Sequence, residues 1–317
     1  MPHNSLAFVF PGQGSQSVGM LAKLADESRV VRATFDEASK VLGYDLWQLC
    51  ASGPVEELNA TERTQPAMLA AGIATWRLWQ ERKGADPAIT TGHSLGEFTA
   101  LVAAGVIEFA ACVELVRFRG RVMQEAVPAG TGAMAALLGL DDGDVVAVCA
   151  EAAAAGGVVE AVNFNSPGQV VIAGDRTAVL RAIEMAKGRG AKRALELPVS
   201  VPAHSSLMRS AGEKLAEKLA STELRAPRLR YLSAVDAQEH RDPDEIRALL
   251  VRQLSSPVRW TATVAALNAS GIKLIVECGP GQVLAGLVKR IMRGGDVQTF
   301  ALENPESFTT ASTAVAA

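Results

Sequence analysis

The pentapeptide Gly92-His93-Ser94-Leu95-Gly96 is the segment of this chain best suited to covalent chemistry. The residues before it, 88–91, are short and partly β-branched, which is typical of a buried strand. After it, apolar residues recur at helical spacing, and Gly105 stands where a helix would end. A serine at a sharp strand-to-helix turn is exposed, and the amides of the first helical turn face the group that it attacks. The pattern therefore predicts a nucleophile at Ser94, with an ordinary structural turn as the alternative.

A neutral serine hydroxyl needs a base within hydrogen-bond reach, and the chain has four histidines. His3 lies at the terminus, His240 lies in a charged stretch, and the side chain of His93 should leave the turn in another direction. His204 follows two prolines that hold an extended, rigid segment suited to positioning an imidazole. His204 is therefore the predicted base, and a half-buried histidine at a helix start is the alternative.

Arg119 falls in the middle of the apolar face of a helix predicted over residues 108–126. A guanidinium there cannot lose its proton and must find an anion or several acceptors. Two interpretations are open on the residues alone. Arg119 is either half of a structural ion pair with a buried acid, or an anion site that binds a substrate carboxylate with two hydrogen bonds.

Three further polar features stand in otherwise apolar settings. The turn Gly12-Gln13-Gly14 follows the predicted first strand, and one of its amides could complete an oxyanion hole with the Leu95 N–H. Gln253 and Asn165 are interpreted as structural hydrogen-bonding residues.

Composition limits the possible functions. The chain has 317 residues, 49% of them apolar, so it can bury a substantial core. A net charge of −3 disfavours nucleic acid as the main partner. No uncharged run is long enough for a membrane span, and no signal peptide is visible. Scattered cysteines without a CxxC pair suit a reducing compartment better than disulfides or zinc, so we expect a cytoplasmic protein with no metal site; they are Cys50, Cys112, Cys149 and Cys278.

The elements that must position these residues alternate between strands and helices. Outside a central segment, this alternation predicts a mostly parallel sheet with helices on both faces, an α/β class. The central segment instead predicts a β-α-β-β-α-β order, which is the ferredoxin-like arrangement. The predicted units are a larger α/β domain of residues 1–127 and 199–302, an inserted ferredoxin-like subdomain of residues 128–198, and a frayed tail of residues 303–317.

Eight segments carry a family resemblance. They read FVFPGQGSQ at 8–16, TQPAM at 64–68, GHSLGEFTAL at 92–101, RGRVMQEAVPAGTGAMAALLGL at 119–140, NFNSPGQVVIAG at 163–174, PVSVPAHSSLM at 198–208, VRQLSSPVRW at 251–260 and ECGPGQVLAGL at 277–287. In this order, from residue 6 to about 302, the chain resembles malonyl-CoA:acyl carrier protein transacylases of bacterial fatty-acid synthesis. The fold that this implies has a hydrolase-like core.

The resemblance also implies roles for residues. Ser94 would carry the acyl group, His204 would act as the base, and Arg119 would pair with the free carboxylate of the malonyl group. Backbone amides of Gln13 and Leu95 would form the oxyanion hole.

Gln253 would orient the histidine through its backbone carbonyl, so that no catalytic carboxylate is required. One departure is visible at Ser233-Ala234, where relatives commonly carry asparagines. It puts a polar contact near the histidine in doubt.

The implied reaction moves a malonyl group from coenzyme A to the phosphopantetheine thiol of acyl carrier protein through a malonyl-serine intermediate. It would need no cofactor, and the expected partners are malonyl-CoA and acyl carrier protein, with no nucleic acid and no membrane, for a monomeric enzyme. The alternatives are a serine hydrolase, a non-catalytic carrier-docking module, and the same transfer in polyketide assembly or malonate decarboxylation.

Two basic clusters could bind an acidic carrier protein, although ordinary solvated charges would look the same. They comprise Lys187, Arg189, Lys192 and Arg193 in the insert, and Lys289, Arg290 and Arg293 near the carboxyl terminus.

Overall fold

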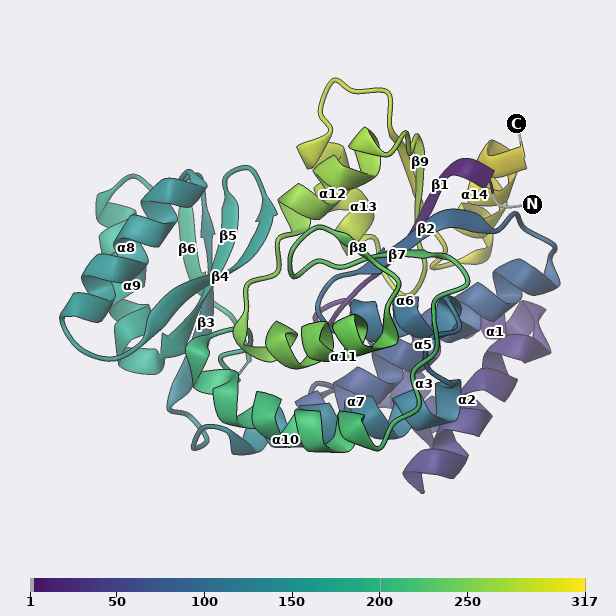
Figure 1. Cartoon of the computed structure of the whole chain (residues 1–317), viewed down its shortest axis with the longest axis horizontal. Helices are drawn as coiled ribbons and strands as arrows, with labels where there is room; N and C mark the ends of the chain where they lie inside the picture. The colour runs from purple at the N-terminus through teal and green to yellow at the C-terminus, as the bar shows by residue number, and fades with distance from the viewer. Residues whose placement is uncertain (1–2, 200, 317) are drawn as a thin grey trace.

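The computed structural model describes residues 3–199 and 201–316. The parts of the predicted units that fall on residues 1, 2, 200 and 317 lie outside the described residues. It contains a six-stranded sheet in the order β10-β9-β1-β2-β7-β8 and a four-stranded sheet in the order β4-β5-β3-β6 (Figure 1). The strands of the larger sheet are β1 (His3–Phe10), β2 (Pro87–Gly92), β7 (Arg230–Leu232), β8 (Glu239–His240), β9 (Leu274–Glu277) and β10 (Gln298–Ala301).

The larger sheet is parallel except at one edge, where β8 runs antiparallel to β7. This confirms the predicted α/β class with a mostly parallel sheet. The register pairs Phe10 of β1 with Gly92 of β2. Both strands therefore end at the same carboxyl edge, which brings the Gln13 turn and the Ser94 turn side by side.

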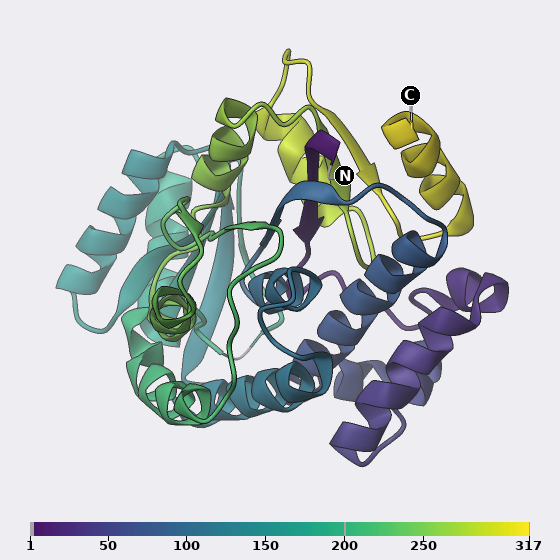
Figure 2. The same ribbon diagram turned by 45° about the vertical axis from the view of Figure 1, so that its right-hand side comes forward.

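Alternating side chains of β1 face two different cores, because successive residues of a strand point to opposite faces. Ala7 and Val9 pack with α12 (Trp260–Ala269) and α13 (Val283–Ile291). Phe8 and Phe10 pack with helices on the other face, chiefly α5 (Thr61–Glu81), α6 (Gly96–Ala103) and α7 (Phe109–Glu125). Figure 2 shows these two groups of helices on either side of the sheet.

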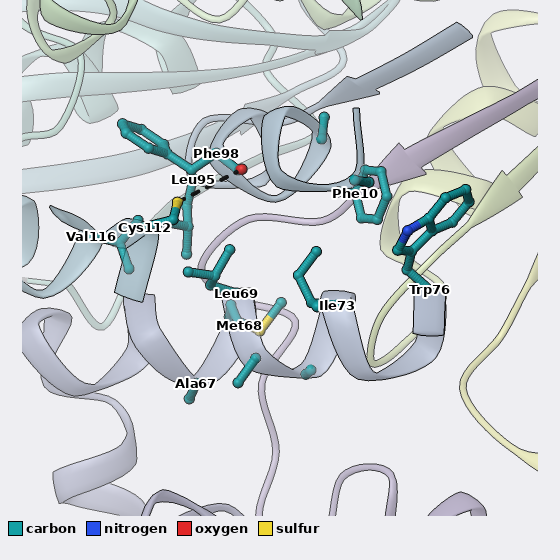
Figure 3. Close-up of a cluster of buried hydrophobic side chains, with 14 of the residues drawn as sticks. Phe10, Ala67, Met68, Leu69, Ile73, Trp76, Leu95, Phe98, Cys112 and Val116 are labelled. Atoms are coloured by element: carbon teal, nitrogen blue, oxygen red, sulfur yellow. Dashed lines mark hydrogen bonds between the residues drawn. The ribbon is translucent and has the colours of Figure 1, made fainter. Parts of the chain in front are cut away.

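The long helix α5 supports the end of the sheet that carries the serine. Its side chains Leu69 and Ile73 point toward Phe10 and toward Leu95, which follows Ser94 (Figure 3). Cys112 of α7 packs beside them, with its Sγ 3.9 Å from the carbonyl oxygen of Phe98. The serine turn therefore rests on a layer of buried apolar side chains.

The remaining helices complete this domain. They are α1 (Ala22–Glu27), α2 (Arg29–Leu42), α3 (Leu46–Ser52), α4 (Val55–Leu58), η1 (Ser206–Met208), α10 (Arg209–Ala220), α11 (Pro243–Arg252) and η2 (Gln253–Ser255). Gly43 adopts a left-handed φ of 77° and caps α2, which ends this helix before α3 begins.

The inserted subdomain has its own antiparallel sheet and core. Its elements are β3 (Gly132–Leu138), α8 (Asp142–Ala154), β4 (Val159–Ser166), β5 (Gln169–Asp175), α9 (Arg176–Gly188) and β6 (Arg193–Glu196). The strand order has the first and third strands of the unit at the centre, as the ferredoxin-like prediction requires. Strand β4 contacts α12 and α13, which joins the subdomain to the larger domain (Figure 1).

The predicted frayed tail is wrong for the described residues. Residues Pro305–Ala316 form α14, in which Phe308, Ala311 and Val315 are buried. The Phe308 ring lies 5.7 Å from that of Trp79, and the guanidinium of Arg82 lies over it. Small and polar residues separate Phe308, Ala311 and Val315 in the sequence and concealed the apolar stripe that these three form at helical spacing.

Candidate active site

Ser94 lies on a sharp turn between β2 and α6, with a left-handed φ of 54° that is strained for a residue other than glycine. The flanking glycines permit this turn. A Cβ at Gly92 would lie 2.0 Å from the carbonyl carbon of Gly96, and a Cβ at Gly96 would lie 1.9 Å from the carbonyl oxygen of Phe10. The pentapeptide therefore packs backbone on backbone, and the local structure is the one that the sequence predicts.

The structure places His204 against this serine. Its Nε2 lies 2.7 Å from Ser94 Oγ, and its Nδ1 lies 2.8 Å from the backbone oxygen of Gln253. A carbonyl oxygen only accepts, so Nδ1 carries the proton and Nε2 accepts from the serine hydroxyl. Burial, reinforced by the charge of Arg119, lowers the pKa of His204 to about 3, so the imidazole is neutral and able to take a proton.

Arg119 is 1% exposed and lies among apolar residues of α7, as expected. It donates to Gln65 Oε1 at 3.0 Å and to Gln253 Oε1 at 2.9 Å, and its Nη2 lies 3.4 Å from Ser94 Oγ. Burial lowers the pKa of Arg119 to about 10, which leaves it charged at neutral pH. Within residues 3–199 and 201–316 it forms no direct ion pair, and its Nε has no partner. This geometry favours the anion site over the structural ion pair.

The two predicted oxyanion-hole amides lie beside the serine turn. A Cβ at Gly12 would lie 2.5 Å from the carbonyl oxygen of His93, so the Gln13 turn packs directly on the pentapeptide. Amides of Gly96 and Glu97 donate to the carbonyls of the turn. In the described part of the chain, the N–H groups of Gln13 and Leu95 have no acceptor. Their role in an oxyanion hole stays a prediction.

The other histidines lie away from the serine hydroxyl. His93 Nε2 lies 2.8 Å from Asn165 Oδ1 at the end of β4, and its ring packs near Trp260. Burial lowers the pKa of His93. His240 contacts Asp236 and a neighbouring glutamate. The His93–Asn165 contact joins the subdomain to the serine turn.

With this geometry established, comparisons with known proteins identify the family. Residues 7–303 match the acyl transferase domain. The chain is 57% identical over 286 residues, 90% of this chain and 92% of the relative, to the malonyl CoA-acyl carrier protein transacylase of Escherichia coli. The chain belongs to this transacylase family.

Solved structures of malonyl transacylases agree with this assignment. The enzyme from Xanthomonas oryzae is 52% identical, with a TM-score of 0.96 and coverage of 99% of both chains. A malonyl transacylase in complex with a type II polyketide acyl carrier protein is also 52% identical, with a TM-score of 0.96, covering 98% of this chain and 99% of that one.

Sequence reasoning missed two polar residues of this transacylase site. Gln65 of α5 binds Arg119, and Glu97 of α6 binds the Gln253 side chain at 2.9 Å. The sequence did carry a signal for Glu97, because it is an acidic residue on an apolar helix, just as Arg119 is a basic residue on one. The departure at Ser233-Ala234 is placed against Glu97 and not against the histidine.

The described residues also bear on metal binding and on membrane insertion. Among the residues that the structure describes, no group of three or more His, Cys, Asp or Glu side chains is arranged to hold a metal ion. Within the same residues, no helix is both long and apolar enough to cross a membrane.

Proposed function

We propose that this chain transfers a malonyl group from malonyl-CoA to the phosphopantetheine thiol of acyl carrier protein, supplying fatty-acid synthesis. One observation carries the proposal. The Ser94 hydroxyl lies 2.7 Å from a neutral imidazole and 3.4 Å from a buried guanidinium. An acyl group attached to this oxygen, and ending in a carboxylate, would have its negative charge beside Arg119.

The first half-reaction loads the serine. Ser94 Oγ attacks the thioester carbonyl carbon while His204 Nε2 takes the hydroxyl proton. The amides of Gln13 and Leu95 would stabilise the oxyanion that forms. When the tetrahedral intermediate collapses, the carbon–sulfur bond breaks, and coenzyme A leaves as the thiol with the proton from His204.

The second half-reaction reverses these roles. The phosphopantetheine thiol gives its proton to His204 and attacks the malonyl-serine ester. The serine oxygen then leaves and recovers the proton. Acyl and proton transfers by side chains account for every step, so we propose that no metal or redox cofactor takes part. A monomeric state and a cytoplasmic location stay predictions from the sequence.

Intact-mass analysis tests the proposal directly. After mixing with malonyl-CoA, the protein should gain one malonyl mass on Ser94, and Ser94→Ala should abolish both the adduct and the transfer. Parallel samples with methylmalonyl-CoA and acetyl-CoA define the acyl group that is accepted. An adduct on Cys278, or none on the wild-type protein, would contradict the assignment.

A time course separates the transferase from a serine hydrolase. A transferase should hold its malonyl adduct until pantetheine or acyl carrier protein is added. Sustained release of coenzyme A without a thiol acceptor would indicate hydrolysis instead.

A further inference from the structure

Glu97 is a fully buried acid that the mechanism above does not use. It lies in the first turn of α6, three residues after Ser94. Four donors surround its carboxylate: the Ala234 N–H and the Ser233 hydroxyl at Oε1, and the Tyr231 hydroxyl and the Gln253 amide at Oε2. An ionised carboxylate has about four acceptor sites, so these four donors fill it.

Gln253 connects this acid to the reacting groups. Its Nε2 donates to Glu97 at 2.9 Å and to the backbone oxygen of Ser94 at 3.0 Å. Its Oε1 accepts from Arg119, and its backbone oxygen accepts from His204. One residue thus contacts the nucleophile, the base, the cation and the buried acid.

The direction of the Gln253 amide follows from its two neighbours. A guanidinium only donates, so the amide turns its oxygen to Arg119, and its nitrogen is left to donate to Glu97. Burial raises the pKa of Glu97 to about 7, and the Gln253 amide is one of the donors that lower it. The charge of Glu97 also raises the pKa of Arg119 against the larger effect of burial. Arg119 therefore stays charged, although the Gln253 amide separates it from Glu97. Because it forms no ion pair with that acid, its N–H groups can donate to a substrate carboxylate.

We propose that Glu97 is a positioning residue for malonyl selectivity, which fixes the Gln253 amide with its oxygen toward Arg119 and so aims the guanidinium at an acyl carboxylate beside Ser94. This inference rests on the proposed malonyl transfer. It concerns how the arginine is held, and Glu97 itself touches no substrate.

The variant Glu97→Gln tests the proposal because an amide cannot satisfy both sides of this cluster. The Ala234 N–H and the Gln253 NH2 are obligate donors that face opposite oxygens of Glu97. With one oxygen only, the new amide either leaves Ala234 unpaired or forces Gln253 to reverse and point its NH2 at Arg119. We expect the malonyl-to-acetyl ratio of Ser94 acylation rates to fall on the order of 10- to 100-fold.

Tyr231→Phe is the matched control. It removes one donor from the same buried carboxylate but leaves the Gln253 amide in place. It should perturb the thermal unfolding of the protein and keep the malonyl-to-acetyl ratio within about two-fold of wild type, within the usual spread of such effects. If Tyr231→Phe lowered the ratio as much as Glu97→Gln, Glu97 would have only a structural role.

A double-mutant cycle completes the test. It also keeps the proposal testable if Glu97→Gln alone fails to fold, because the second substitution removes the donor conflict. Gln253→Met keeps the backbone carbonyl for His204 and removes the side-chain amide. In the combined variant the new amide at position 97 can accept from Ala234 and donate to the Tyr231 hydroxyl, so the donor conflict is relieved. We expect the combined variant to match the malonyl-to-acetyl ratio of Gln253→Met alone.

The proposal would be overturned if the combined variant lowered the malonyl-to-acetyl ratio by the product of the two single effects. It would also be overturned if Glu97→Gln left this ratio unchanged. Neither result would contradict the proposed malonyl transfer. Only a wild-type protein that forms no malonyl adduct would remove the function on which the proposal rests.

Discussion

The Ser94 hydroxyl lies between a base and a cation that constrain each other. During each half-reaction His204 must hold a positive charge, and Arg119 opposes that charge, since its presence lowers the pKa of the histidine. A malonyl carboxylate bound to Arg119 would offset the guanidinium charge and make protonation of His204 easier. An acetyl group brings no such compensation. The same arginine would therefore affect both recognition and proton transfer.

Arg119→Ala should separate these substrates. We expect malonyl transfer to fall at least about 10- to 100-fold, because a charge-assisted contact is worth about 1.5–3 kcal/mol. Acetyl transfer should be retained or raised, since the acetyl group makes no such contact. Rates of adduct formation with malonyl-CoA and acetyl-CoA measure the difference.

Arg117→Ala is the control for that prediction. Arg117 lies on the same helix, but its side chain is 41% exposed and its charge faces Glu62. It should leave both rates nearly unchanged. Equal losses on both substrates in Arg119→Ala would show that Arg119 only supports the structure.

Single residues with a local signal were predictable, and those without one were not. Glycines flank Ser94, prolines precede His204, and Arg119 places a charge on an apolar helical face, so each residue has a signal in its own neighbourhood. Glu97 and Gln65 act through partners far along the chain: Gln253 is 156 residues from Glu97, and Arg119 is 54 residues from Gln65. Only the fold brings such pairs together.

At the scale of elements, the end of β9 shows how one side chain supports a helix. Glu277 is fully buried, and its Oε2 accepts from the Ala285 N–H at 2.8 Å in the first turn of α13. Its other oxygen has no partner in the described residues. Burial raises the pKa of Glu277 to about 7, even though the helix amides lower it. This acid caps α13 at the cost of burying its own charge.

Glu277→Gln should therefore change the pH dependence of stability. The folded-state pKa of Glu277 lies above the unfolded value of 4.5, so its contribution to stability is present below pH 4.5 and is lost as pH rises toward 7. The loss is about 3 kcal/mol by linkage. Glutamine does not titrate, so the melting temperature of the variant relative to wild type should rise between pH 5 and pH 8.

Thermal unfolding at the two pH values checks this prediction. Glu306→Gln, at an exposed position of α14, is the control and should shift little. A melting-temperature difference for Glu277→Gln that is the same at both pH values would show that Glu277 does not titrate in this range.

Elements with strong periodicity or turn chemistry were predictable, including the serine turn and the whole β-α-β-β-α-β insert. Short edge elements were not. Strand β10 has four residues, and β8 has two, which is too short for an alternating pattern. Helix α14 is stabilised by Phe308 packing on Trp79, a contact with a residue more than two hundred positions earlier.

At the scale of the whole molecule, the fold brings the two basic clusters toward one another. Arg290 of α13 donates to Gln169 of β5, and the Lys192 side chain packs over Gly139, whose N–H donates to the carbonyl of Gly168. These contacts meet at the turn between β4 and β5. That turn follows Asn165, which binds His93 beside the serine. Arg290 and Lys192, one cation from each basic cluster, therefore lie at this turn, on a chain with a net charge of −3.

Some cations of the two basic clusters form ion pairs and others do not, and this difference refines the prediction about carrier binding. Lys187 pairs with Glu184, and Arg189 pairs with Glu151. Within the described residues, the five other exposed cations of the clusters form no ion pair, and one of them, Arg290, binds the neutral Gln169 side chain; the five are Lys192, Arg193, Lys289, Arg290 and Arg293. Unpaired charges should attract an acidic carrier protein more strongly than neutralised ones.

We therefore expect charge reversal at Lys192 and Lys289 to lower kcat/KM for acyl carrier protein by about ten-fold at low salt, with a weaker salt dependence. Formation of the malonyl adduct from malonyl-CoA, and transfer to free pantetheine, should be unchanged because neither uses the docking surface. Reversal of the paired Lys187 and Arg189 is the matched comparison and should have a smaller effect. If reversal of the unpaired cations leaves carrier kinetics unchanged at low salt, the carrier binds another face of the molecule, and the two clusters are ordinary solvated charges.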